Sequence, residues 1–114
     1  MTASAYAQVV TTHDERPVAD QIAADVVGAR VAACAQVDGP VTSTYWWDGE
    51  LQTASEWRVT FKTRAELVPA LVARIRAAHT YDVPEIVAVP ITGGEPDYLA
   101  WIDLETAAAV AAAR

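Results

Sequence analysis

The feature that most constrains this chain is the stretch of residues 43–63, which predicts a long β-hairpin. Asp48 and Gly49 separate two strand-like runs, and an Asp-Gly pair favours a two-residue turn in which both residues have positive φ. Side chains alternate between the two faces of a strand, so Trp46 and Trp47 point to opposite faces. One face can pack on helices of the same chain. The other needs cover, which we expect other copies of the protein to supply.

Length and charge exclude several classes of protein. A chain of 114 residues forms one domain, residues 1–114. Eight basic residues and a net charge of −7 argue against nucleic acid and anionic membrane surfaces as partners. A single cysteine rules out an intrachain disulfide and suits a reducing compartment. No apolar run approaches the roughly 20 residues that span a bilayer, and the first residues lack a signal-peptide pattern, so the expected location is the cytoplasm.

Hydrophobic periodicity predicts seven elements along the chain. Pro17 fits the first turn of a helix, with Asp14 or a neighbour as its cap. Thr63 and Glu66 have the spacing of a capping box at the start of a second helix. The predicted strands are 6–12, 31–47 with a bend or bulge at 38–40, 51–62 and 85–91; the predicted helices run from 17 to about 30, from 63 to 78, and from 97 into the alanine-rich tail.

The order strand, helix, strand, strand, helix, strand, helix predicts an α+β domain. Its first six elements have the ferredoxin-like split βαβ arrangement, in which two helices cover one face of an antiparallel sheet. The other face would stay bare within one chain. This prediction supports an oligomer independently of the aromatic hairpin.

Short motifs occur in a fixed order over nearly the whole chain. They are Ala32-Ala33-Cys34, Val41-Thr42-Ser43, Tyr45-Trp46-Trp47-Asp48-Gly49, Glu56, Lys62-Thr63, His79-x-Tyr81-x-Val83-Pro84-Glu85 and Tyr98-Leu99-x-Trp101-Ile102. In this order they resemble the CutA family of divalent-cation tolerance proteins, except that Thr80 stands where the family usually has proline. The resemblance implies a ferredoxin-like homotrimer in which the hairpin reaches across subunits, with copper or another divalent cation as a ligand and no cofactor required.

Cys34 and His79 are the candidate metal ligands that the resemblance implies. Cys34 is either a small core residue or a thiolate for a soft cation such as Cu(I). His79 ends a predicted helix, where it is either an imidazolium favoured by the helix dipole or a ligand. His13 precedes a helix and is expected to be solvated. No closely spaced ligand motif is present, so a metal site would be assembled in space, including between subunits.

Four polar residues of the motifs form a candidate ligand cleft: Lys62, Glu56, Tyr81 and Glu85. A basic group just before a helix suits a small anionic ligand, as in a trimeric effector-binding module of the PII type. The alternative is an ion pair of Lys62 with Glu56 or Glu85 that fixes the trimer.

The aromatic residues Tyr45, Trp46, Trp47 and Trp57 are the predicted trimer interface. The sequence has no paired nucleophile and base and no glycine-rich phosphate loop, so no enzyme activity is predicted. A module that stabilises a protein partner, without metal chemistry, is a further alternative.

Overall fold

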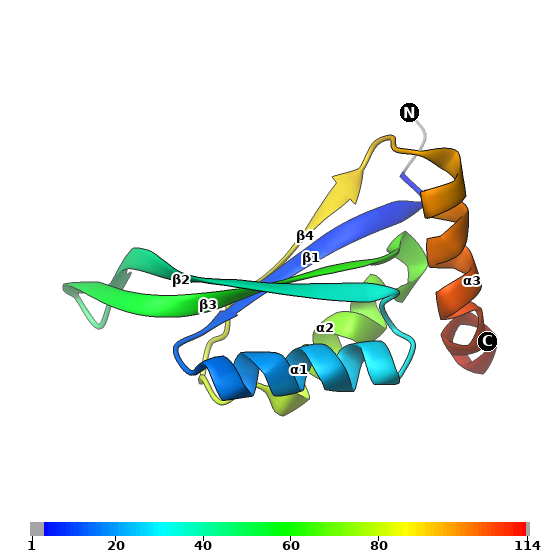
Figure 1. The fold of residues 1–114 in the computed structure, drawn as a ribbon. Coiled ribbons are helices and arrows are strands. Elements are labelled where there is room, and N and C mark those ends of the chain that lie inside the picture. Colours follow the sequence, from blue (N-terminus) through cyan, green and yellow to red (C-terminus); the bar gives the residue numbers. More distant parts are fainter. Residues whose placement is uncertain (1–3, 114) are drawn as a thin grey trace.

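The computed structural model describes residues 4–113, which form a four-stranded sheet and three α-helices. Figure 1 shows the hairpin β2–β3 projecting from one end of the molecule and α3 standing at the other. The elements are β1 (Tyr6–His13), α1 (Arg16–Gly28), β2 (Cys34–Trp47), β3 (Glu50–Arg64), the 3-10 helix η1 (Ala65–Leu67), α2 (Val68–Ala78), β4 (Ile86–Ile91) and α3 (Pro96–Ala113).

The sheet has the strand order β2-β3-β1-β4, and every neighbouring pair is antiparallel. Helices α1 and α2 lie side by side on one face of it (Figure 1). This arrangement confirms the α+β class with an antiparallel sheet. Among the described residues no helix is both long enough and apolar enough to cross a membrane.

The core lies between the sheet and the helices α1 and α2. Val59 and Phe61 of β3 and Val9 of β1 are fully buried there, as the alternation of side chains predicts. Ile22 on α1 and Ile75 on α2 complete this cluster from the helix side. The residues of β3 that alternate with Val59 and Phe61, including Arg58 and Lys62, consequently belong to the opposite face of the sheet, which we call the open face.

The hairpin turn is the predicted one, because Asp48 and Gly49 have φ values of 51° and 76°. A register shift between Asp38 and Val41 confirms the predicted bulge in β2. Strand β1 pairs with β3 only as far as Trp57, so no third strand of the described residues lies beside the outer part of the hairpin. The aromatic side chains at its end are exposed: Tyr45 by 42%, Trp46 by 72% and Trp47 by 52%.

The predicted helix starts and one strand start were partly wrong. Thr63 belongs to β3, and its buried hydroxyl donates to the Val31 carbonyl at 2.7 Å instead of capping a helix. A 3-10 turn follows before α2 begins, with no side-chain cap. Glu15, the neighbour of Asp14, is the N-cap residue of α1, as the prediction allowed, but it makes no side-chain capping hydrogen bond. Helix α1 ends at Gly28, and β2 begins at Cys34, three residues later than predicted.

The open face is not entirely bare, because α3 covers one end of it. The Tyr6 hydroxyl donates to the Asp103 carboxylate at 2.6 Å, and Arg64 donates to Thr106 at 3.0 Å. Tyr6 and Arg64 are paired residues of β1 and β3 on the open face. The rest of this face, toward the hairpin, has no cover from the described part of the chain. The sequence could not show this because helical periodicity does not tell where a helix packs.

Candidate functional site

The two predicted metal ligands lie at opposite ends of the sheet. Cys34 pairs with Lys62 across β2 and β3, whereas His79 bonds to Thr12, which pairs with Arg58. Lys62 and Arg58 are four residues apart on β3, a separation of roughly 13 Å at about 3.3 Å per residue. Within one chain, therefore, the structure does not bring Cys34 and His79 to a common ion.

Cys34 is half-buried and lies on the open face beside Lys62. Its Sγ is 3.4 Å from the hydroxyl oxygen of Tyr98 on α3, a contact in which either group can donate. The pKa of Tyr98 is raised to about 12, mainly because of this hydrogen bond. The thiol thus belongs neither to the core between sheet and helices nor to a ready-made ligand set.

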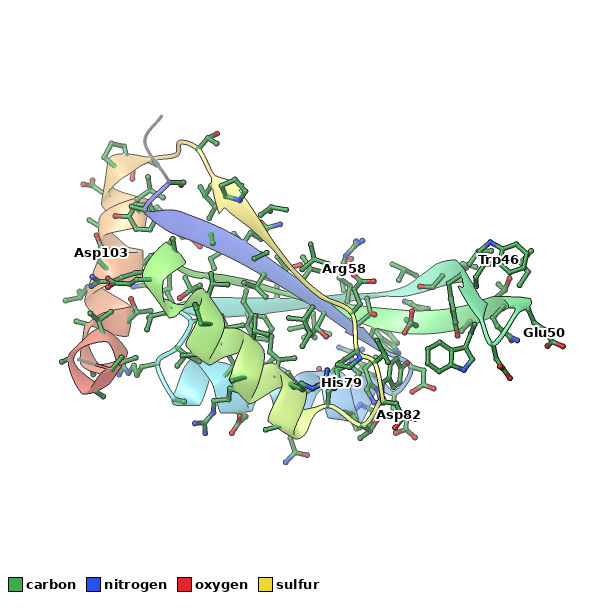
Figure 2. All side chains as sticks on the ribbon, turned by 180° about the vertical axis from the view of Figure 1, so that it is seen from behind. Trp46, Glu50, Arg58, His79, Asp82 and Asp103 are labelled. Atoms are coloured by element: carbon green, nitrogen blue, oxygen red, sulfur yellow. The ribbon has the colours of Figure 1, made fainter. Side chains whose placement is uncertain are left out.

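At the other end, His13, His79 and Tyr81 pack their rings together, and Glu56 joins them; we call these four residues the histidine cluster. The ring centroids are 5.0 Å apart for His13 and His79, and 4.9 and 4.6 Å for each histidine with Tyr81. His13 is only 1% exposed, so the expectation of a solvated side chain was wrong. The segment between α2 and β4 folds over it, which no local pattern of the sequence indicates. Figure 2 shows His79 in this segment, below the base of the hairpin.

Both ring nitrogens of His79 are engaged. Its Nδ1 accepts the Tyr81 N–H at 3.2 Å, so its Nε2 carries the proton and donates to the Thr12 carbonyl at 2.7 Å. Burial is the main cause that lowers the pKa of His79. The imidazolium expected from the dipole of α2 is therefore wrong, and the neutral ring has no free lone pair for a metal ion in this state.

His13 has the same pattern of bonds. Its Nδ1 accepts the Glu15 N–H at 2.9 Å, and its Nε2 lies 2.6 Å from the Thr80 hydroxyl. His13, Asp14 and Glu15 also offer ligand atoms within 4.8 Å of one another. The Nδ1 atom of His13 already accepts the Glu15 N–H, and the side chains of Asp14 and Glu15 are exposed. This group is thus not preorganised for a metal ion.

Tyr81 connects the histidine cluster to the hairpin. Its hydroxyl donates to Glu56 Oε2 at 3.0 Å and accepts the Asp14 N–H at 2.9 Å. Burial, followed by the bond to Glu56, raises the pKa of Tyr81 strongly. Glu56 is 7% exposed and is the only buried acidic side chain in residues 4–113.

The other predicted cleft residues are separate from this cluster. The Lys62 ammonium donates to the Gln36 side chain at 2.8 Å, and Glu85 is exposed. Within the described chain Lys62 makes no ion pair with Glu56 or Glu85. Trp57, placed in the predicted interface, lies on the helix side of the sheet, where it packs against the core and under the Arg16 guanidinium at 4.8 Å.

The lowered pKa of His79 gives a prediction about pH. A group whose pKa is lower in the folded chain binds more protons when unfolded, so its stabilising contribution is complete above the ordinary pKa of 6.5 and is lost as the pH falls through the lower value. We expect the free energy of unfolding to decrease between pH 7 and pH 5.5, and His79→Gln to flatten this decrease. Urea unfolding at several pH values measures it; equal slopes for the two proteins would contradict the prediction.

The family model described as CutA1 divalent ion tolerance protein matches residues 7–105. The mouse protein named Protein CutA is 41% identical over 99 residues, covering 87% of this chain and 55% of the mouse protein. A Yersinia pestis divalent-cation tolerance protein CutA is 34% identical over 95 residues, covering 83% of this chain and 80% of that protein. The chain thus spans about half the length of the mouse relative, and the same holds for a chloroplastic rice relative, of which 55% is covered.

Solved structures agree with the fold. CutA from Xylella fastidiosa superposes with a TM-score of 0.87 at 36% identity, covering 90% of this chain and 99% of that one. The divalent cation tolerance protein of Thermus thermophilus gives a TM-score of 0.82 at 39% identity, covering 85% and 94% of the two chains.

Proposed function

Because the chain belongs to the CutA1 divalent ion tolerance family, we propose that it acts in tolerance of divalent cations as a ferredoxin-like homotrimer, with copper as the first cation to test. The observation that carries this proposal is the family match over residues 7–105, which includes nearly every described strand and helix. The strand order β2-β3-β1-β4, with two helices on one face, supports the ferredoxin-like arrangement.

Two surfaces of the single chain support an assembly. The end of the hairpin exposes Trp46, Trp47 and Leu51, and such a group of large apolar side chains is typical of a protein interface. The part of the open face that α3 leaves uncovered includes Val87 and Val89 of the edge strand β4, which are exposed by 50% and 46%. Packing open faces around a three-fold axis would cover both surfaces.

Cys34 is the residue through which we propose that copper binds. Thiolates are soft ligands that favour Cu(I), and the thiol lies on the open face, which the proposed trimer would place toward other copies. One sulfur does not make a site, so further ligands would come from neighbouring copies. His79 is not included, because its nitrogens are already engaged.

Isothermal titration calorimetry of the intact protein with Cu(I) and with Cu(II) tests this proposal. Tight binding of copper is expected, and Cys34→Ser should abolish it, because a hydroxyl is a poor ligand for a soft cation. Tyr98→Phe is the matched control, since it removes the hydroxyl beside the thiol but leaves the sulfur. Unchanged copper affinity in Cys34→Ser would exclude the thiol as a ligand.

No observation favours the alternative of a PII-type effector module. Lys62 donates to Gln36, and the histidine cluster presents a carboxylate, not a cation, to an anionic ligand. A location in the cytoplasm also stays a prediction, because one relative is named as chloroplastic and one solved structure as periplasmic.

A further inference from the structure

Two opposite charges of the open face have no counter-charge among residues 4–113. Glu56 is buried, and its carboxylate receives one hydrogen bond, from the neutral Tyr81 hydroxyl. A carboxylate can accept about four hydrogen bonds, and burying it without a cation is costly. The local charges add to this cost, because Asp14 lies beside Tyr81 and no Lys or Arg side chain of the described residues pairs with Glu56.

Lys62 is the complementary group. It is the only lysine of the chain, it is half-buried, and its ammonium makes one hydrogen bond to the described residues, to the neutral Gln36 amide. An ammonium has three donors, so two are available for further bonds. Among the described basic residues only Lys62 and Arg76 lack a carboxylate partner, and Arg76 is exposed on α2 and donates to a loop carbonyl.

These two charges cannot meet within one copy. Glu56 and Lys62 lie on the same face of β3 but six residues apart, which corresponds to roughly 20 Å. That distance exceeds the combined reach of the two side chains. Each copy thus carries one unmatched acceptor at the base of the hairpin and one unmatched donor near α3, on the surface that the proposed trimer would bury.

We propose that Lys62 of one copy forms an ion pair with Glu56 of the next copy around a ring of three. This inference rests on the proposed homotrimer and identifies the charges that fix its register. A head-to-tail contact presents two different patches to each other, and it closes into a ring when the rotation from one copy to the next brings the third copy back to the first. In such a ring every Lys62 and every Glu56 is matched. The Tyr81 hydroxyl then orients the carboxylate toward the incoming ammonium.

A zero-length cross-link tests this contact directly. A water-soluble carbodiimide activates a carboxylate, which a touching amine then attacks, so that an amide forms between Glu56 and Lys62 with net loss of water. Because Lys62 is the only lysine, the reactive amines are few. The expected result is a covalent trimer on a denaturing gel, with peptides that join Glu56 to Lys62. Lys62→Gln should remove these products, and Asp25→Asn, which changes an exposed carboxylate paired with Arg74 on the helix layer, should not.

A double-variant cycle provides the second readout. Glu56→Gln and Lys62→Gln are each expected to weaken association by about 30-fold or more per interface, because each leaves one charge buried and unpaired. The loss of affinity between copies in the double variant should be much smaller than the product of the losses in the two single variants. If Glu56→Gln fails to fold, the cross-link in the unmodified protein and its loss in Lys62→Gln still decide the question.

Four results would overturn the proposal. A cross-linked band that stops at the dimer would indicate a two-fold contact. A cross-linked trimer without the Glu56–Lys62 link would show that the pair does not form. Multiplicative effects of the two variants on association would show the same. Loss of Cu(II) binding in Glu56→Gln with unchanged association would assign the missing cation to a metal ion. By contrast, a monomeric unmodified protein would refute the proposed trimer itself.

Discussion

Replacing Trp46 and Trp47 at the end of the hairpin with serine is expected to turn the proposed homotrimer into folded single chains. Trp46 is 72% exposed in one chain, so its loss removes no core contact, and Trp47 is 52% exposed. At an interface, buried tryptophans typically contribute about 2 kcal/mol or more each, which is roughly a 30-fold change in affinity per side chain. Sedimentation velocity should show the smaller species, and far-UV circular dichroism should show the same secondary structure as the unmodified protein.

The matched control is Val83→Ser, which removes another exposed apolar side chain from the segment between α2 and β4. It is expected to leave association unchanged. Equal association of the tryptophan variant and the unmodified protein would contradict the assignment of the hairpin to the interface. Trp57 offers a contrast, because it packs against its own core and its replacement should lower chain stability directly.

Phe61→Ala is expected to cause the largest loss of chain stability. The Phe61 side chain is fully buried in the core, between the sheet and helices α1 and α2. Truncating a buried phenylalanine to alanine usually costs about 3–5 kcal/mol, because the side chain loses its burial and leaves a cavity. That is a large part of the roughly 5–15 kcal/mol that stabilises a typical domain.

Urea unfolding measures this loss, and it is best done in the Trp46→Ser, Trp47→Ser background, where dissociation does not contribute. Thr60→Ala, at the neighbouring position on the open face, serves as the control and should cost less than about 1 kcal/mol. A loss below about 1 kcal/mol for Phe61→Ala would show that β3 does not lie in the core as described.

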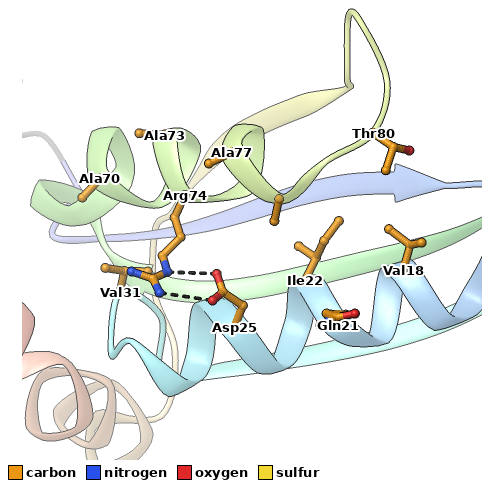
Figure 3. A pocket seen from close by; sticks show the side chains of 11 residues that line it. Val18, Gln21, Ile22, Asp25, Val31, Ala70, Ala73, Arg74, Ala77 and Thr80 are labelled. Carbon is orange, nitrogen blue, oxygen red and sulfur yellow. Dashed lines mark hydrogen bonds and ion pairs between the residues drawn. The ribbon is translucent and has the colours of Figure 1, made fainter.

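An ion pair spans the groove between α1 and α2. The groove has a volume of about 820 Å³ and is lined by alanines of α2 and by Val18 and Ile22 of α1 (Figure 3). The bidentate ion pair of Arg74 with Asp25, at 2.9 and 3.1 Å, bridges the two helices there. Both side chains are well exposed, so the pair contributes little to stability and mainly sets how the helices face each other.

The parts of the fold that the sequence predicted are those governed by local rules. Alternation along β3 placed Val59 and Phe61 on one face and Lys62 on the other, and Asp48-Gly49 specified the turn. The motifs also identified Glu56 and Tyr81, which the structure brings into one hydrogen bond. These features depend only on neighbours along the chain or on residues of a single hairpin.

The parts that the sequence did not predict depend on how distant segments fold together. His13 is buried because the segment after α2 closes over the end of β1, and nothing near His13 indicates this. The Thr63 hydroxyl bonds to Val31 because β3 continues to Arg64, two residues beyond the end of the predicted strand. For the same reason, no periodicity within α3 could show that it covers one end of the open face.

We infer that two other copies complete the open face and the aromatic hairpin of one chain. Sedimentation equilibrium of the unmodified protein over a wide range of concentrations tests it most directly. We expect a particle with three times the mass of one chain, dissociating only on strong dilution. A particle of single-chain mass at every concentration would contradict it.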